Sequence, residues 1–313
     1  MMKVGENISE IPKINLEKTK SDIIEFIKSK VDESKTNGVV VGLSGGIDST
    51  LVAYLSCEAL GKENVVGVLL PSEYSTSHSV SDAKASADNL QIEHYTIPIK
   101  ESFTTIHSAL QPVFKDLPFG LAEENLQSRI RLSIIMGIAN KIGAAMLNTT
   151  NKSETAVGYG TLYGDTSGGI AAIGDMYKTE VWKLSRWINR EKEIIPENSI
   201  IKAPSAELRP DQKDSDSLPD YDVLDRVLYL HIEQGKSKRE IINEGFDEQT
   251  VEKIRKSLEL AVKNSGVSVV YAQAEVKTPQ TIIADDIEYN VGEIIYATGE
   301  KNYLEVKNKI LTK

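Results

Sequence analysis

The apolar positions in the first half of the chain switch between helical and strand-like spacing. Apolar residues within 16–31 recur at the interval of one helix face, which predicts an amphipathic helix. The β-branched run Val39–Leu43 predicts a buried strand, and a glycine-rich loop separates it from an apolar helix over 50–60. Further strands are predicted at 65–70, 92–99 and 144–149, and further helices at 81–90 and 121–142. This alternation predicts an α/β fold, a doubly wound parallel sheet with helices on both faces.

The pattern changes after Thr149. Residues 150–177 are rich in Gly, Thr and Tyr, which is typical of a loop that lines a substrate site, and a helix is expected at 179–190. A polar, proline-bounded loop at 204–219 resembles a lid. Helices are then predicted at 220–234, 237–244 and 248–263, and strands at 267–271 and 287–291. We therefore expect one domain over 1–265 and a small β-rich extension over 266–313.

Composition narrows the class of protein. The chain has 40% hydrophobic and 26% charged residues, which is ordinary for a globular protein. No apolar run approaches the roughly 18 residues of a membrane span, and Met1–Lys13 lacks the apolar segment of a signal peptide. Cys57 is the single cysteine, so no internal disulfide can form. We expect a cytoplasmic protein with no membrane partner, and the net charge of −10 disfavours nucleic acid.

The glycine-rich loop reads Ser44-Gly45-Gly46-Ile47-Asp48-Ser49. A strand, a glycine turn and a helix together form an anion site, because the free amides at a helix N-terminus point at the anion. No Lys follows the glycines, so this is not a Walker A loop, and the spacing is not G-x-G-x-x-G. Phosphate charge must then be met by amides, by a cation from elsewhere and by Mg²⁺, for which Asp48 supplies an oxygen ligand.

The string S-G-G-x-D-S resembles the signature of the N-type ATP pyrophosphatases, in which this loop binds the pyrophosphate released during adenylation. Longer strings are similar to NAD synthetases, especially the synthetase domain of the glutamine-dependent kind. They lie at 118–131 (PFGLAEENLQSRIR), 149–165 (TTNKSETAVGYGTLYGD), 173–179 (IGDMYKT) and 203–225 (APSAELRPDQKDSDSLPDYDVLD). The resemblance covers roughly residues 20–263. It implies that ATP adenylates deamido-NAD, that ammonia then forms the amide, and that NAD, AMP and pyrophosphate leave.

The resemblance also implies roles for individual residues. Asp48 matches a Mg²⁺ ligand, and Lys178 matches a phosphate-binding lysine that supplies the missing cation; both are the expected catalytic residues. Glu154 matches a second acidic position, assigned to the metal or to the deamido-NAD site. The expected ATP contacts are Gly42, Leu43, Ser44, Gly45, Gly46, Ile47, Asp48, Ser49, Thr149, Lys178 and Ser205. The expected deamido-NAD contacts are Asn125, Arg129, Glu154, Tyr159, Gly160, Thr161 and Leu162.

Two departures from the family pattern bear on the substrates. Roughly forty residues precede the Val39 strand, so we expect no nitrilase-like glutaminase domain and the use of free ammonia or of a separate glutaminase. The basic run that the family carries after its last helix is replaced by Lys263–Val269, which has no basic cluster. Either Lys277, Lys301 or Lys307 of the tail replaces it, or the acceptor carboxylate differs from deamido-NAD.

Three hypotheses remain. The first is an ammonia-using NAD synthetase, for which the resemblance implies a homodimer. The second is a related ATP-dependent amide ligase that acts on another carboxylate. The third is a non-catalytic nucleotide-binding or partner-binding protein, which would be expected to have lost Asp48, Glu154 or Lys178, although all three are present. A tRNA-modifying enzyme is disfavoured by the acidic charge and by the lack of metal-binding cysteines.

Overall fold

A five-stranded parallel sheet forms the centre of the computed structural model, which describes residues 11–264, 280–284 and 287–291. The strands are β1 (Val39–Gly42), β2 (Val65–Leu69), β3 (Glu93–Thr96), β4 (Ala145–Asn148) and β5 (Ile170–Ala171). They lie in the order β3-β2-β1-β4-β5, and every neighbouring pair is parallel. The order reverses between β1 and β4, so the crevice at their carboxyl ends is the expected ligand site of such a sheet.

Side chains of β1 alternate between the two faces of the sheet, as the pleat of a strand requires. Val39 and Val41 pack in one hydrophobic cluster, whereas Val40 packs in another, and all three are fully buried. A strand that is apolar on both sides needs a layer of helices over each face. Both layers are present, which confirms the predicted doubly wound α/β class.

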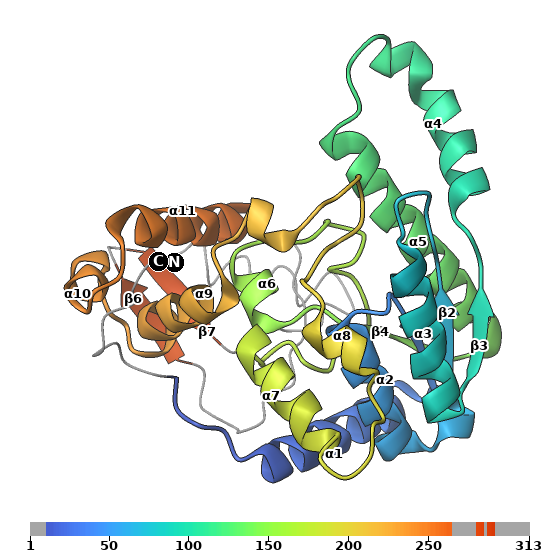
Figure 1. Cartoon of the computed structure of the whole chain (residues 1–313), viewed down its shortest axis with the longest axis horizontal. Coiled ribbons are helices and arrows are strands. Elements are labelled where there is room, and N and C mark those ends of the chain that lie inside the picture. The colour runs from blue at the N-terminus through green and yellow to red at the C-terminus, as the bar shows by residue number, and fades with distance from the viewer. Residues whose placement is uncertain (1–10, 265–279, 285–286, 292–313) are drawn as a thin grey trace.

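The first face is covered by helices from both halves of the chain (Figure 1). They are α1 (Leu16–Ser34), α2 (Ile47–Leu60), α3 (Ser77–Leu90), α7 (Lys178–Ile188) and the short α8 (Glu197–Ile201). α2 contacts β1, α1, α3 and α7, so nearly all of its sides are buried. Its first turn, which carries the glycine-rich loop, is therefore held rigidly at the edge of the crevice.

The opposite face is covered by α5 (Leu121–Ile142), which packs Ile130, Ile135 and Ala139 beneath the sheet. α4 (Lys100–Phe114) contacts α5, but none of its residues is buried. Figure 1 shows α4 standing away from the sheet, beside the N-terminal end of α5.

A third group of helices packs beside α7 around its own apolar cluster, which includes Leu224, Val227 and Ile254. In Figure 1 most of these helices lie to the left of α7, on the far side from β2 and β3. They are α6 (Lys152–Ala156), α9 (Tyr221–Leu228), a π-helical turn η3 (Tyr229–Glu233), α10 (Lys238–Asn243) and α11 (Glu248–Asn264). Two 3₁₀ turns, η1 (Lys62–Asn64) and η2 (Asp214–Asp216), complete the described helical elements.

The four strands and the long helices predicted for residues 16–149 are all observed. β5 was not predicted, because a two-residue strand carries no periodic pattern within the glycine-rich segment 150–177. α6 lies in the same segment, which we had expected to be a loop throughout, and its start at Asn151 is marked by a side-chain cap to the amide of Glu154. α4 was also not predicted.

The described part of the C-terminal segment contains β6 (Gln280–Ala284) and β7 (Ile287–Val291), which pair in antiparallel fashion. β7 coincides with the strand predicted at 287–291. The strand predicted at 267–271 and the domain boundary predicted between 265 and 266 lie outside the described residues, so the division of the chain stays a prediction. Among the described residues, no helix has the length and apolar character needed to cross a bilayer.

Candidate active site

The loop Ser44–Ser49 joins β1 to α2 and turns sharply at Gly45. The φ angle of Gly45 is +78°, and a Cβ there would lie 2.2 Å from the carbonyl oxygen of Ser79 in α3. The Ser44 Oγ accepts a hydrogen bond from the amide of Gly46 at 3.1 Å, which shapes the turn. The first amides of α2 therefore face the crevice from a tightly held loop, which is the geometry of an anion site.

Three charged side chains from distant parts of the sequence meet next to this loop. Lys178, the first residue of α7, forms an ion pair with Asp48 Oδ2 from the first turn of α2. Its Nζ also lies 3.4 Å from Glu154 Oε1 of α6. Asn151 donates from Nδ2 to Asp48 Oδ1 at 3.0 Å, so both oxygens of the Asp48 carboxylate are engaged. The predicted catalytic pair and the predicted second acid thus form one cluster.

Burial governs the protonation of this cluster. The side chain of Lys178 is 3% exposed, and those of Asp48 and Glu154 are each 16% exposed. Burial by itself lowers the pKa of Lys178, but the adjacent carboxylates of Asp48 and Glu154 raise it above its usual value, so the ammonium stays charged. Burial raises the pKa of Glu154 to about 8, against the opposing effect of Lys178. At neutral pH the cluster therefore holds little net charge.

A buried carboxylate on α9 fixes the backbone from which Lys178 and Glu154 project. Asp225 accepts hydrogen bonds from Ser153 Oγ at 2.5 Å and from the amide of Thr179 at 2.8 Å. Ser153 Oγ in turn accepts from the amide of Lys178 at 2.9 Å. The first two amides of α7 thus find their partners on α6 and α9. Burial raises the pKa of Asp225 to about 6.

Sequence reasoning missed Asn151, Ser153 and Asp225. A signal for Asp225 was available, because it lies on the apolar face of α9 beside the buried Tyr221 and Leu224. A carboxylate on such a face is uncommon unless it is hydrogen-bonded. Ser153 offered no comparable signal.

The residues predicted to hold the second substrate lie on α5 and on the loop after α6. Thr161 donates from Oγ1 to Asn125 Oδ1 at 2.7 Å, and Arg129 donates from Nε to the carbonyl of Leu162 at 3.1 Å. The predicted common face of Asn125 and Arg129 is therefore confirmed. In this structure, however, both side chains hold the Thr161–Leu162 segment.

The predicted lid, 204–219, is anchored at several points. Asp214 is buried and accepts hydrogen bonds from the hydroxyl of Tyr159 at 2.9 Å and of Tyr221 at 2.8 Å. Ser205 donates from Oγ to the carbonyl of Gln212 at 2.5 Å, which closes the loop on itself. Because Tyr159 belongs to the predicted substrate segment, the lid and that segment are joined directly.

These groups surround one cavity of about 590 Å³ at the carboxyl ends of the strands. Gly45, Arg129 and Leu162 are not among the lining residues. The other predicted residues all line it: Gly42, Leu43, Ser44, Gly46, Ile47, Asp48, Ser49, Asn125, Thr149, Glu154, Tyr159, Gly160, Thr161, Lys178 and Ser205. The cavity also has apolar walls, to which Ile135 and Met146 contribute. It therefore combines a polar anion seat with apolar surface that suits a ring.

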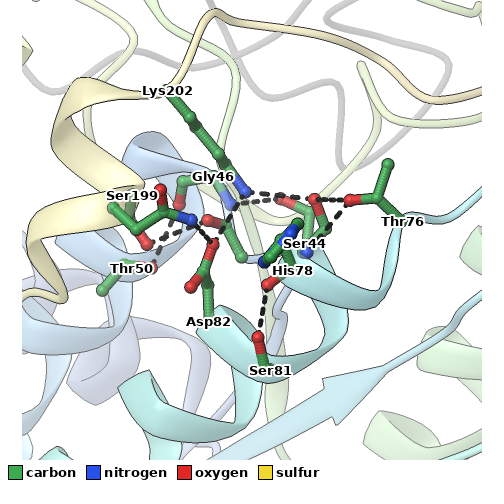
Figure 2. A network of polar contacts seen from close by, with 12 residues as sticks. Ser44, Gly46, Thr50, Thr76, His78, Ser81, Asp82, Ser199 and Lys202 are labelled. Carbon is green, nitrogen blue, oxygen red and sulfur yellow. Dashed lines mark hydrogen bonds and ion pairs between the residues drawn. The ribbon is translucent and has the colours of Figure 1, made fainter. Parts of the chain in front are cut away.

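A polar network ties the glycine-rich loop to α3 and α8 (Figure 2). Ser199 of α8 donates from Oγ to the carbonyl oxygen of Gly45 at 2.9 Å. Lys202, which follows α8, donates from Nζ to Ser79 Oγ at 3.1 Å and lies 3.4 Å from Asp82 Oδ2. Ser199, Asp82 and Lys202 were not predicted, because nothing in their local sequence separates them from surface residues.

A metal was predicted at Asp48 and Glu154. Among the described residues, no group of three or more His, Cys, Asp or Glu side chains is placed to hold a metal ion. The predicted pair nevertheless fits Mg²⁺, which binds through one or two carboxylates together with phosphate oxygens. Both carboxylates line the cavity beside the loop, and the Lys178 ammonium contacts each of them.

The sequence profile of the NAD synthase family matches residues 19–262. The chain belongs to the NAD synthase family. Over 250 residues it is 52% identical to the glutamine-dependent NAD(+) synthetase of Synechocystis sp., and the match covers 80% of this chain but 45% of that protein. The chain thus spans less than half the length of the curated relatives that it matches most strongly.

Two solved NAD synthetases extend the comparison. The glutamine-dependent enzyme from Acinetobacter baumannii, in complex with ADP, matches 83% of this chain and 46% of its own, with a TM-score of 0.59 and 35% identity. The NH3-dependent enzyme from Campylobacter jejuni matches 82% of this chain and 99% of its own, with a TM-score of 0.67 and 26% identity. The residues matched by the family profile, 19–262, contain the five-stranded sheet and the residues that line the cavity.

Proposed function

We propose that this chain uses ATP to adenylate the nicotinate carboxylate of deamido-NAD, and that ammonia then converts the adenylate to the amide. In the first step a carboxylate oxygen attacks the α-phosphorus of ATP, and the bond to pyrophosphate breaks. In the second step ammonia attacks the acyl carbon, AMP leaves, and a proton is released. The observation that carries this proposal is the meeting of the loop Ser44–Ser49, Lys178 and the substrate segment around one cavity.

The residues of the chain act by positioning and by charge. The amides of the loop bind the pyrophosphate. The Lys178 ammonium stabilises the negative charge that develops on the leaving pyrophosphate, once the phosphates compete with Asp48 for it. Thr149 and Ser205 line the cavity where ATP would lie. Because ammonia is itself a nucleophile, no nucleophilic side chain is needed, and the described residues that line the cavity include neither His nor Cys.

We propose Mg²⁺ as the cofactor, held by Asp48 and Glu154. The ion would neutralise part of the charge of the phosphates. Its binding requires an ionised Glu154, and the raised pKa of that group therefore describes the site without the ion.

The nitrogen donor of this chain is proposed as ammonia, either free or released by a separate glutaminase. The NH3-dependent relative, which the chain covers almost completely, supports the first source. The glutamine-dependent relatives, which it covers by less than half, support the second.

A second candidate is an amide ligase that acts on another carboxylate. It is favoured by the missing basic run at 263–269, and the three lysines that could replace that run lie outside the described residues. Asn125 and Arg129 support deamido-NAD less strongly than expected, because they contact the protein's own Thr161–Leu162 segment.

A substrate panel tests the proposal. The full chain is incubated with ATP, Mg²⁺ and ammonium, and pyrophosphate release is followed with deamido-NAD, nicotinate mononucleotide and other carboxylates. Release with deamido-NAD and formation of NAD support the main proposal. Release only with another carboxylate selects the second candidate. Replacing ammonium with glutamine then tests the nitrogen donor.

We further propose a homodimer and no membrane or nucleic-acid partner. The apolar side chains of Val113, Leu117 and Leu121, around the turn between α4 and α5, are 72%, 73% and 71% exposed. Exposed apolar residues that lie together are typical of a subunit interface. Light scattering after size-exclusion chromatography should give twice the 34.5 kDa chain mass, and a monomer mass would contradict this assignment.

A further inference from the structure

Lys178 alone does not solve the charge problem of the glycine-rich loop. Its ammonium is shared between the acidic side chains of Asp48 and Glu154, so a phosphate must compete with both of them for it. The loop itself contains no basic residue. A triphosphate bound at the loop would therefore meet little free positive charge from Lys178 alone.

Besides Lys178, the described residues that line the cavity include three cations, namely Arg131, Lys202 and Arg209. Arg209 is 40% exposed and forms ion pairs with Glu124 and Asp216, which keep it with these two acids. Arg131 donates from Nε to the carbonyl of Leu70, which follows β2. Within the described part of the chain, neither arginine has a hydrogen bond or ion pair to the loop, α2, α3 or α8, whereas Lys202 contacts α3.

Short contacts through Ser79 of α3 connect Lys202 to the loop. The Nζ of Lys202 lies 3.1 Å from Ser79 Oγ, and the carbonyl oxygen of Ser79 is the atom that a Cβ on Gly45 would strike. A second route comes through α8, because Ser199 binds the Gly45 carbonyl and Lys202 follows three residues later. In Figure 2 the side chain of Lys202 points toward Asp82 and the part of the view that holds Ser44 and Gly46.

The partners of Lys202 orient its ammonium without fully neutralising it. An ammonium has three N–H donors, and Ser79 Oγ and Asp82 Oδ2 take two of them. The same Asp82 oxygen also accepts from Asn198 Nδ2 at 2.6 Å, so its negative charge is shared between two donors. The hydroxyl of Ser79 donates a hydrogen bond to Glu207 Oε1 at 2.6 Å, so its oxygen can accept from Lys202. Among the described residues these are the acceptors of Lys202, which leaves one N–H donor available for a ligand.

We infer that Lys202 is a second phosphate-binding cation, which meets the pyrophosphate portion of ATP from the side of α3 and α8 while Lys178 meets it from the side of α7. This inference rests on the proposed function, because it concerns the anion bound in the same loop. Ser199 acts as a positioning residue by docking α8 on Gly45, and Asp82 pairs with the ammonium and competes with a ligand for it. Two lysines therefore line the cavity beside the loop, Lys178 at the start of α7 and Lys202 just after α8.

The test is calorimetric titration of the full chain with inorganic pyrophosphate in the presence of Mg²⁺. Lys202→Gln should weaken pyrophosphate binding about 10-fold, since a charged hydrogen bond is lost. Lys202→Arg, which keeps the charge, should recover most of the affinity. Asp82→Asn should tighten binding, because it removes the carboxylate that competes with the ligand. Lys213→Gln is the matched control, because Lys213 is exposed in the neighbouring loop and does not line the cavity.

Pyrophosphate affinity in Lys202→Gln equal to that of the wild type would overturn the inference, and so would weaker binding in Asp82→Asn. Circular dichroism of each variant shows that the fold is kept, and Lys202→Arg and Asp82→Asn still decide the question if Lys202→Gln does not fold. If the wild-type protein binds pyrophosphate but forms none from ATP in the presence of deamido-NAD, that result would contradict the proposed function alone. Wild-type release together with undiminished binding in Lys202→Gln would contradict Lys202 alone.

Discussion

Asp225 and Ser153 form a hydrogen bond of 2.5 Å in the protein interior, between helices α9 and α6. Asp225 is fully buried, and its second oxygen accepts from the amide of Thr179. Because Ser153 precedes Glu154 and Thr179 follows Lys178, this one carboxylate holds two of the three charged residues of the site. The active-site geometry therefore depends on a residue that does not line the cavity.

We expect Asp225→Asn to reduce both stability and turnover. An amide offers one oxygen where the carboxylate offered two, so one buried donor loses its partner, at a cost of about 1–3 kcal/mol in the free energy of unfolding. The kcat of pyrophosphate release should fall, because Lys178 and Glu154 lose their fixed separation. Urea unfolding and the release assay measure the two effects. Asp222→Asn on the exposed side of the same helix should change neither, and an unchanged kcat in Asp225→Asn would show that the clamp is not needed.

Asp48→Asn tests the assignment of the loop carboxylate directly. The substitution keeps the shape and the hydrogen bond to Asn151 but removes the negative charge beside Lys178. We expect turnover to fall by at least about 100-fold, with the fold retained. Steady-state pyrophosphate release and circular dichroism provide the two readouts. Full activity in this variant would exclude a role of Asp48 in binding Mg²⁺.

Some parts of the structure could be predicted from local sequence patterns, whereas others could be predicted only from resemblance to a family. The strands and long helices of residues 16–149 follow from apolar periodicity, and the loop Ser44–Ser49 follows from its glycines between a strand and a helix. Lys178 and Glu154 carry no such signal, since a lysine or a glutamate at a helix start is usually a surface charge. They could be named only through resemblance to a family.

The rest of the site depends on contacts across long sequence separations. Ser199 and Gly45 are 154 positions apart, and Asp225 and Ser153 are 72 positions apart. No periodicity reports which loop docks on which, because such pairs arise only when the sheet has brought its helices together. The same reason explains why Lys202 was missed, although its neighbour Ser205 lies in a recognisable string.

The pH dependence of the free energy of unfolding is expected to reflect protonation of the Glu180 carboxyl group. This side chain is 7% exposed and accepts from the amide of Tyr177 at 2.9 Å, and burial raises its pKa from 4.5 to about 7. A raised pKa means that the folded state holds the proton more tightly than the unfolded state. The resulting stabilisation is fully present below pH 4.5 and is lost as the pH rises through 7.

Glu180→Gln should therefore be more stable than the wild type at pH 8, by up to about 3 kcal/mol, with a flatter stability profile between pH 4.5 and 7. Urea unfolding at a series of pH values measures this. Glu191→Gln is the matched control, because the side chain of Glu191 is 83% exposed and its loss should leave the profile unchanged. An identical pH profile for Glu180→Gln and the wild type would rule out this group as the source.

Among substitutions that add a single methyl group to the loop, Gly45→Ala is expected to damage the anion site most. The added Cβ would lie 2.2 Å from the Ser79 carbonyl oxygen, a backbone atom that cannot turn away as a flexible side chain could. The φ angle of +78° adds strain, because L residues rarely adopt it. The loop must shift away from α3, and we expect pyrophosphate affinity to fall by at least about 10-fold.

A glycine elsewhere separates this steric effect from the general effect of the substitution. Gly137 lies on the exposed side of α5, and a Cβ there would meet nothing within 4 Å. Alanine favours a helix more than glycine does, so Gly137→Ala should raise the free energy of unfolding by about 0.5–1 kcal/mol and leave pyrophosphate binding unchanged. If calorimetry showed the same affinity in Gly45→Ala as in Gly137→Ala, the close contact between the loop and α3 would have no part in binding the anion.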